Sequence, residues 1–494
     1  MDTDYSNPAK KYLQIPAKKK DQVTTEVGFP RDWKFEDMHL PENWKELALG
    51  KLDDYLRKYR SVRLYMDICV RCGACSDKCQ FYIGTKDPMN TPVGRAELLR
   101  SVYRRYFTAS GKLLGKVAGA RDLDEDMIKK WYTYFYQCSE CRRCSYFCPY
   151  GIDTAEITMA GREVMASVGL TPKYVTEVSA KARLIGNNLG LPPAAIANSV
   201  KFAEEEVKEE TGQEVHVPIN KKGAQVLFVT PSADFFGETH WNTFKGYIKL
   251  FHYIGLDYTL STLASEGGNF GLFLNYDNMK AINRRIVDEA RRLEVKWIMG
   301  GECGHMWRVI HDFMDTMNGP LDFLEQPVSP VTGTKFENAK STKMVHVVEF
   351  TADLIKHNKL ELDPSKNKDY TVTMSDSCNP ARALGLIEQP RCILEAVCPN
   401  YVEMDPNTNR EKTYCCGAGA ALLTDEIMEL RMKGGGPKAM AVKESGANFV
   451  ALICAICKAN YPHLMKHWNI NTKVGGVHEL LGNALVFDGK SDRK

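Results

Sequence analysis

Short apolar runs alternate with longer amphipathic stretches in the second half of the chain. The apolar runs have the length and composition of strands buried on both faces, and they lie at 226–229, 297–299, 370–374 and 449–453. The amphipathic stretches have the apolar spacing of helices, and they lie at 240–254, 277–293, 381–397 and 437–445. Strands that alternate with helices predict α/β layers built on parallel strands.

The alternation occurs twice, which predicts a degenerate internal repeat. A cysteine follows a strand in each half, Cys303 in the first and Cys454 in the second. Each half also closes with a similar segment, 347–350 in one and 477–480 in the other. We therefore predict two α/β repeats, at residues 222–365 and 366–494.

Helical spacing dominates the region before these repeats. Stretches with apolar residues on one helical face lie at 95–107, 125–137 and 154–168, and 201–212 is a charged stretch expected to be a solvated helix. A polar linker ending at Gly223 marks the boundary. We therefore predict a helical domain at 55–215, and a multidomain α+β and α/β protein as a whole.

Residues 1–54 show little periodicity. They contain four prolines, a run of lysines and several aromatic residues, among them Phe29, Trp33 and Trp44. Two interpretations stay open. The segment is either a flexible tail or an extended arm that becomes ordered on a partner subunit.

Composition narrows the class of protein. The 494 residues are 44% hydrophobic and 26% charged, as in globular proteins, and the net charge of +3 gives no reason to expect nucleic-acid binding. Sixteen cysteines without an apolar leader favour reduced thiols and a cytoplasmic location. No apolar run reaches the roughly 18 residues that span a bilayer, so membrane contact is expected only through partners.

Eight cysteines in the first half form two copies of the motif Cys-x2-Cys-x2-Cys-x3-Cys. In this motif three thiolates bind one [4Fe–4S] cubane and the fourth binds the other. The pattern predicts one cubane on Cys69, Cys72, Cys75 and Cys148, and a second on Cys138, Cys141, Cys144 and Cys79. Two complete copies disfavour zinc ribbons and disulfides. Adjacent cubanes with only cysteine ligands are suited to moving single electrons.

Two details of these motifs are open to interpretation. Pro149 follows the second copy, as is usual, but Gln80 follows the first. The basic residues Arg71, Lys78, Arg142 and Arg143 lie within the turns. They either offset the charge of the clusters, which would raise their potentials, or are solvated loop charges.

A second cysteine set lies in the last third of the chain and consists of Cys378, Cys415, Cys416, Cys454 and Cys457. Five thiols exceed the four ligands of an ordinary cubane or zinc site, which indicates an unusual iron–sulfur centre. Gly417 and Gly419 permit close backbone approach beside the double cysteine. Cys454 and Cys457 end an apolar strand, at the carboxyl edge where α/β folds place their sites.

These residues resemble the cysteine-rich CCG domain of heterodisulfide reductases. A two-cubane module before two such repeats resembles the D subunit of those enzymes and, still more, the DsrK subunit of the DsrMKJOP membrane complex. The resemblance covers about residues 55 to 485. It implies that the five cysteines hold a noncubane [4Fe–4S] cluster at which a disulfide is cleaved.

The resemblance also implies partners and a place. In that family the catalytic subunit lies on the cytoplasmic face of the membrane and receives electrons from quinol through a haem b subunit, DsrM. Its proposed substrate is a disulfide or trisulfide of the sulfur carrier DsrC, in dissimilatory sulfur metabolism. This chain shows no flavin-binding glycine signature, so no flavin is expected in it.

The first repeat departs from the family pattern. Glu266-Gly267-Gly268 stands where the double cysteine is expected, and Cys303-Gly304-His305 stands at the Cys-x-x-Cys. We therefore expect no cluster there, which favours the DsrK type. Cys303 and His305 either assist the centre, His305 as a proton donor, or are an ordinary buried cysteine and histidine.

Other residues and functions stay open as well. Arg382 either orients an anionic substrate or lies on the surface. Cys392 and Cys398 are expected to be structural. The alternative functions are a heterodisulfide reductase for a small thiol disulfide and a non-catalytic electron-relay subunit.

Overall fold

The computed structural model describes residues 40–487, which form two compact units. The first comprises the described residues up to Glu177 together with Leu272–Tyr276 and Glu411–Met440. The second comprises Val178–Gly271, Asp277–Arg410 and the described residues from Ala441 onward. The predicted domain limits stay predictions.

Unit 1 is helical, apart from short turns and loops. Residues 1–39 of the expected N-terminal arm lie outside the described residues, whereas 44–54 begin a helix, because Ala48, Leu52 and Tyr55 bury one face of it. The helices of this unit are α2 (Trp44–Lys58), α3 (Arg60–Ile68), α4 (Gln80–Thr85), α5 (Pro92–Phe107), α6 (Ala109–Leu114), α7 (Glu125–Phe135), α8 (Arg143–Tyr146) and α9 (Thr154–Ser167).

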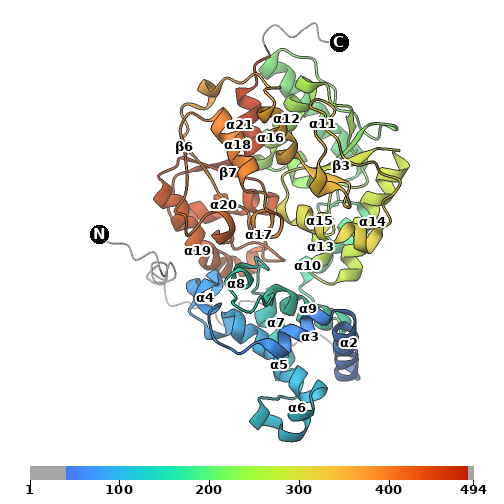
Figure 1. Ribbon diagram of the computed structural model, residues 1–494, viewed down its shortest axis with the longest axis vertical. Coiled ribbons are helices and arrows are strands. Elements are labelled where there is room, and N and C mark those ends of the chain that lie inside the picture. Colours follow the sequence, from blue (N-terminus) through green and yellow to red (C-terminus); the bar gives the residue numbers. More distant parts are fainter. Residues whose placement is uncertain (1–39, 488–494) are drawn as a thin grey trace. The chain divides into compact units, whose positions relative to one another are not determined.

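Helix α9 is the centre of unit 1, and α2, α5 and α7 pack against it (Figure 1). Gly161 allows α7 to approach closely, because a side chain there would overlap the ring of Phe135. Helix α5 begins where the sequence favours it: Thr91 caps the first turn by accepting a hydrogen bond from Gly94 N (3.1 Å), and Pro92 occupies the first helical position.

Unit 2 contains two four-stranded parallel sheets with the same strand order, and Figure 1 labels β3 of the first and β6 and β7 of the second. The first has the order β2-β1-β3-β4 and the second has the order β6-β5-β7-β8. The strands are β1 (Val226–Val229), β2 (Tyr258–Thr259), β3 (Trp297–Gly300), β4 (Met344–His346), β5 (Val372–Met374), β6 (Tyr401–Val402), β7 (Phe449–Leu452) and β8 (Lys473–Gly476). The predicted α/β layers with parallel strands are confirmed.

Helices flank these strands. Those that lie wholly within unit 2 are α11 (Pro193–Thr211), α12 (Glu238–Ile254), α15 (Gly304–Asn318), α16 (Val347–Lys356), α17 (Cys378–Leu384), α18 (Glu388–Val397), α20 (Ala455–His467) and α21 (Val477–Ala484). The chain passes from one unit to the other within α10 (Lys173–Ile185), α13 (Asn269–Leu272), α14 (Tyr276–Arg292) and α19 (Met428–Ser445).

Close helix packing joins the two repeats inside unit 2. Helix α12 of the first repeat packs on α21 of the second, and α16 packs on α18. A side chain at Gly246 would overlap the carbonyl of His478, and one at Gly482 would lie 2.9 Å from Gly246 Cα. Glycine at both positions therefore lets the α12 and α21 backbones approach closely.

Two expected elements differ from the structure. The stretch 381–397 is two helices, because Gly385 has φ 65° and ends α17 before α18 begins at Glu388. The apolar run that starts at Phe449 is a strand only as far as Leu452, and α20 begins at Ala455. Cys457 therefore lies on a helix rather than at a strand end.

Candidate iron–sulfur sites

The first candidate site lies at the surface of unit 1. Cys69, Cys72, Cys75 and Cys148 line one cavity, together with Pro92, Val93, Ala96 and Arg100 from α5. The thiol of Cys72 is exposed. Burial raises the pKa of Cys75 to about 11, against the lowering effect of a backbone hydrogen bond with Val93. The structure thus brings together the four thiols expected to hold the first cubane, from both motif copies, and they fit such a cluster.

The second candidate site lies in the same unit, where Cys79 is buried and Cys138, Cys141 and Cys144 are half-buried. Burial first, and then the neighbouring thiols of Cys141, Cys138 and Cys79, raise the pKa of Cys144 well above its usual range. The four thiols expected to hold the second cubane are therefore also neighbours.

Among residues 40–487 no three His, Cys, Asp or Glu side chains are placed to hold a single metal ion.

The two motif copies have the same backbone course. Arg71 and Glu140, each two residues after the first cysteine of its motif, have φ 58° and 51°. Gly73 and Arg142, each one residue after the second cysteine, have φ 78° and 58°. Left-handed conformations are unfavourable for residues other than glycine. Their repetition at matching positions indicates that both turns have the same function.

Helix α5 supplies a buried arginine to each site. Arg100 lines the first cavity and donates from Nε to Met66 O (3.2 Å). Arg95 lies among the thiols of the second cubane site. Burial lowers the pKa of its guanidinium, but Cys138, Cys79 and Cys144 raise it, and the net shift is upward. Cationic side chains beside thiolates raise the potential of a bound cluster. Sequence analysis missed both residues, because α5 contains further arginines and nothing in its sequence marks these two as buried.

Gln80, which replaces the usual proline, connects the two motifs. Its Nε2 donates to Ser139 Oγ (3.1 Å), and its Oε1 lies 3.7 Å from Cys141 Sγ. The side chain is almost fully buried. The amide therefore has a structural role at the second site that proline could not fill.

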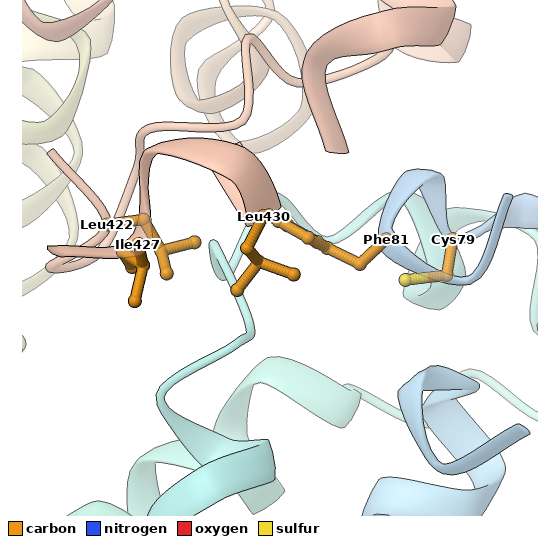
Figure 2. Packing of buried hydrophobic residues seen from close by; sticks show 5 residues of the cluster. All are labelled: Cys79, Phe81, Leu422, Ile427 and Leu430. Carbon is orange, nitrogen blue, oxygen red and sulfur yellow. The ribbon is translucent and has the colours of Figure 1, made fainter. Parts of the chain in front are cut away.

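The segment Glu411–Met440, which contains Cys415 and Cys416, packs on the second site within unit 1. Figure 2 shows Leu430 beside Phe81, next to Cys79, and the buried cluster also includes Leu422 and Ile427. Two glycines permit this packing. A side chain at Gly84 would overlap the carbonyl of Lys433, and one at Gly434 would overlap the ring of Phe81.

Two buried arginines hold this segment to the second motif. Arg143 donates to Lys412 O and to Lys78 O (both 2.9 Å), and its guanidinium lies 3.9 Å from the ring centre of Tyr414. Arg162 donates to Ala420 O (3.1 Å) and to Cys138 O (2.7 Å). Arg143, expected either to offset cluster charge or to be solvated, is fully buried.

Replacing Arg143 with glutamine is expected to loosen the segment 411–440. The change removes two charge-assisted hydrogen bonds from the half-buried carbonyls of Lys78 and Lys412, which is a loss of about 3 kcal/mol. Amide hydrogen exchange of 411–440 should then quicken by roughly a hundred-fold. Arg142→Gln is the matched control, since Arg142 pairs with Asp153 (2.8 Å) and Glu156 (3.4 Å) instead. Equal exchange in the two variants would contradict the role of Arg143.

The double cysteine lies in a tight turn. Gly417 has φ 94°, and a side chain there would also lie 2.8 Å from Gly435 N, so both conformation and space require glycine. Gly417 N donates to Cys415 Sγ at 3.4 Å. Cys415 and Cys416 are both buried. The expectation for Gly417 is thus met, whereas the next left-handed residues are Ala420 and Ala421, not Gly419.

The other three thiols of the second set come together at one edge of the second sheet in unit 2. β5 and β7 pair in parallel, so the loops that follow them lie at the same edge. Cys378 begins α17 after β5, and Cys454 and Cys457 lie at the start of α20 after β7. Ser377 Oγ is 4.0 Å from Cys457 Sγ, and a side-chain hydrogen bond links Cys454 with Cys457.

Cys303 and His305 of the first repeat lie against this edge, within the same unit. Cys303 precedes α15 with φ −130° and ψ 105°, nearly the conformation of Cys454 before α20 (−146° and 123°). A side chain at Gly304 would lie 3.4 Å from Cys454 Sγ. The pKa of Cys454 is held well below its usual range by the hydrogen bond with Cys457, against burial, and then by one with His305.

Glu266, which stands at the position of the missing double cysteine, is buried beside Cys303. It accepts hydrogen bonds from Ser232 N (3.1 Å) and Ser232 Oγ. Burial raises its pKa to about 7, despite these bonds, and the charge of Asp234 adds to the rise. The pKa of Cys303 is raised mainly by burial, then by Cys454, and then by the charge of Glu266.

Replacing Glu266 with glutamine is expected to change how stability depends on pH. The pKa of this carboxyl rises from about 4.5 to about 7 on folding. The folded protein therefore loses stability as pH rises from about 4.5 to about 7, and the full loss above pH 7 is about 3 kcal/mol. Glu266→Gln should therefore gain stability over the parent above pH 7, in thermal unfolding followed between about pH 5 and 8. Glu289→Gln is the control of opposite sign, because Arg292 and Ser261 lower the pKa of Glu289 against partial burial. An unchanged pH profile in Glu266→Gln would refute the assignment.

A buried ion network joins the two repeats behind Cys454 and Cys457. Lys458 Nζ lies 3.2 Å from Glu302 Oε2, 3.8 Å from Asp234 Oδ1 and 3.2 Å from Thr243 Oγ1. Glu302 Oε1 lies 2.8 Å from Nδ1 of His478. The ionised side chains are fully buried, and sequence analysis did not single out any of them.

The remaining candidates lie apart from this network. Arg382 is half-buried in α17, on the helix that begins with Cys378. Cys392 is half-buried in α18, and Cys398 ends that helix. Burial raises the pKa of Cys398 to about 12, as in an unreactive thiol. The substrate role of Arg382 and the structural role of the two cysteines stay predictions.

Comparison with known proteins agrees with these sites. Residues 65–152 match the model of the 4Fe-4S dicluster domain. The chain is 49% identical to the Hdr-like menaquinol oxidoreductase iron-sulfur subunit 2 of Archaeoglobus fulgidus, over 96% of this chain and 90% of that protein. The chain belongs to the family of Hdr-like menaquinol oxidoreductase iron–sulfur subunits. The family's subunit from Archaeoglobus profundus is also 49% identical, over 93% of this chain and 85% of that protein.

More distant relatives extend the family. The D subunit of the dihydromethanophenazine:CoB–CoM heterodisulfide reductase of Methanosarcina barkeri is 23% identical, over 85% of this chain and 94% of that protein. The resemblance to the D subunit of heterodisulfide reductases is thus confirmed, and so are [4Fe–4S] binding and a place in electron transfer. No solved structure is significantly similar to the chain. No helix of residues 40–487 is long and apolar enough to cross a membrane.

Proposed function

We propose that this chain is the catalytic subunit of a membrane complex that reduces a disulfide or trisulfide with electrons from menaquinol. Electrons would enter through a haem b subunit resembling DsrM and pass along the two cubane sites to a noncubane [4Fe–4S] centre held by Cys378, Cys415, Cys416, Cys454 and Cys457. The substrate would be a sulfur carrier of the DsrC type. The chain would lie on the cytoplasmic face, bound through its partners.

The packing of the segment 411–440 on the second motif is the observation that carries this proposal. Arg143, itself in the second motif, donates to a carbonyl of that segment and to Lys78 O beside Cys79. Arg162 donates to carbonyls of that segment and of Cys138, so Cys415 and Cys416 are tied to the second cubane site. The first site, in contrast, has an exposed thiol. This asymmetry supports electron entry at the first cubane and exit from the second.

The names of the relatives support both ends of the route. Two relatives are named menaquinol oxidoreductase subunits, and a third is named a heterodisulfide reductase subunit. Reducing a disulfide takes two electrons and leaves thiolates that must be protonated. A cluster bound by the five cysteines would supply one electron at a time to the sulfur atoms.

Side chains of the first repeat would serve the same reaction. Cys303 and His305 lie next to Cys454, and the imidazole of His305 makes a hydrogen bond with the Cys454 thiol. An imidazole so placed can hold a proton close to the reacting sulfur. We therefore assign His305 as the proton donor and Cys303 as an accessory thiol.

Reoxidation of the reduced protein tests the proposed function. Full-length protein, purified without air and reduced with dithionite, should be reoxidised within seconds by a DsrC-type disulfide or trisulfide. Low-temperature paramagnetic resonance should show both cubanes returning to the oxidised state. About twelve irons per chain are expected from three four-iron clusters.

The same assay separates the alternatives. Reoxidation by a small heterodisulfide of the CoM–CoB type, and not by the carrier protein, would identify the small-thiol reductase instead. A protein whose clusters are unaffected by either disulfide, while still accepting electrons, would be a relay subunit, and the catalytic proposal would be abandoned.

A further inference from the structure

Helix α6 and the turn after it form an apolar projection on unit 1. Leu113, Leu114 and Val117 are 85%, 53% and 90% exposed, and they lie on α6 and on the short helix η5 (Gly115–Ala118). Figure 1 shows α6 at the lower tip of unit 1, beyond the end of α5. Isolated apolar side chains are common on surfaces, but three within five positions form a patch that needs a partner.

The projection is held in shape at its base. Thr108 caps α6 by accepting a hydrogen bond from Gly111 N (3.1 Å), and a side chain at Gly111 would overlap the carbonyl of Arg104. Ala120 N donates to Gly115 O (3.1 Å), and Arg121 N donates to Ser101 O (3.0 Å). The backbone bonds close the loop, so the apolar tip is presented in a fixed conformation.

The sequence that forms the projection carries basic residues and no acidic ones. Between Glu97 and Asp122 the sequence has no acidic residue but has the basic residues Arg100, Arg104, Arg105, Lys112, Lys116 and Arg121. Arg100 and Arg104 pair with Glu97, and Arg105 pairs with Asp122. Lys112 and Lys116, which alternate with the apolar residues, have no ion-pair partner in the part of the chain that the structure describes.

We propose that this projection docks on the surface of an anionic phospholipid bilayer. Apolar side chains that enter the headgroup region, flanked by lysines that face lipid phosphates, are the features of segments that lie on a membrane without spanning it. Charge complementarity selects this occupant over a protein partner, because buried protein interfaces are depleted in lysine. The contact would be direct, in addition to that expected through partner subunits.

Docking there would bring an electron-entry site close to the membrane. Arg100, which lines the first cubane cavity, is seven positions before the end of α5 at Phe107, so about 10 Å of helix separates the cavity from the projection. A donor within the bilayer would then be near the exposed Cys72. This consequence rests on the proposed function, whereas the docking itself does not.

Vesicle flotation of the full-length protein tests the docking. The protein should float with phosphatidylcholine vesicles that contain phosphatidylglycerol, and its binding should fall steeply with added salt. Leu113→Asp with Val117→Asp should lower the binding constant by more than about a hundred-fold, because two apolar side chains lose their insertion and two charges are added. Lys112→Gln with Lys116→Gln should lower it by roughly thirty-fold, at about five-fold for each lysine.

Matched variants keep the test specific. Leu184 and Phe202 are 75% and 61% exposed and lie elsewhere in the sequence, so Leu184→Asp with Phe202→Asp should leave binding unchanged. Iron content and cubane signals should be the same in all variants, which shows that each is folded. The proposal is overturned if the parent protein does not float, if phosphatidylcholine alone binds it equally well, or if the control pair weakens binding as much as the tip pair. A parent that floats only with its membrane subunit present in the vesicles would assign the patch to that protein instead.

Discussion

Serine in place of Cys416 is expected to abolish disulfide turnover and the spectroscopic signal of the unusual cluster. Iron–sulfur clusters require soft thiolate ligands, and a serine hydroxyl neither ionises near neutral pH nor replaces sulfur on iron with comparable affinity. Cys416 precedes Gly417 in a tight turn, where the left-handed backbone and the close approach of Gly435 leave no room for a side chain at position 417. The turn therefore cannot supply another ligand in place of Cys416. Loss of a cluster ligand should lower turnover by at least about a hundred-fold.

The cubane signals distinguish this effect from unfolding. Both should persist in Cys416→Ser, because the thiols grouped at each of the two sites belong to the two motif copies and do not include Cys416. Cys392→Ser is the matched control, since Cys392 is half-buried in α18, and it should keep full turnover. Undiminished turnover in Cys416→Ser would refute the proposed centre.

Methionine in place of Lys458 is expected to destabilise unit 2 by about 3–5 kcal/mol. The change leaves Glu302 and Asp234 as buried carboxylates without their cation. Burial would raise the pKa of Glu302, but the charge of Lys458 and hydrogen bonds from His478 keep it well below its usual range. A fall of roughly 10 °C in the unfolding midpoint, followed by calorimetry, is the corresponding observation.

Neutral partners should restore the stability. Adding Glu302→Gln and Asp234→Asn to Lys458→Met removes the unpaired charges, and most of the lost midpoint should return. Lys222→Met is the exposed counterpart, because Lys222 and Glu294 form a surface pair worth less than about 1 kcal/mol. If Lys458→Met shifted the midpoint no more than Lys222→Met, the network would have no structural importance.

Local chemistry made part of this molecule predictable. The run 226–229 is a strand with the same bounds in the structure, because a strand buried on both faces is apolar at every position. Cysteine spacing predicted two groups of four thiols, and the structure brings the members of each group together, although their binding of cubanes stays a prediction. Both inferences needed only neighbouring residues.

Long-range contacts set the limit of such inference. No local signal places Leu422 or Leu430 beside Phe81, since more than three hundred residues separate them. A lysine such as Lys458 is expected at the surface from sequence alone. Its burial is explained only by the buried carboxylates of the first repeat, such as that of Glu302, with which it pairs. The apolar spacing of 381–397 predicts a helix but does not show a break at Gly385, because a single glycine does not always end a helix. The left-handed conformation of Gly385 ends α17 there.

Unequal solvent access at the two cubane sites has a practical consequence for handling the protein. Cys72 is open to water, whereas Cys79 is buried in a cluster with Phe81 and Leu430. Dissolved oxygen would reach the outer cluster first, so brief exposure to air should remove its iron while the inner cluster survives. Partly degraded samples would then keep one cubane signal and lose communication with their electron donor.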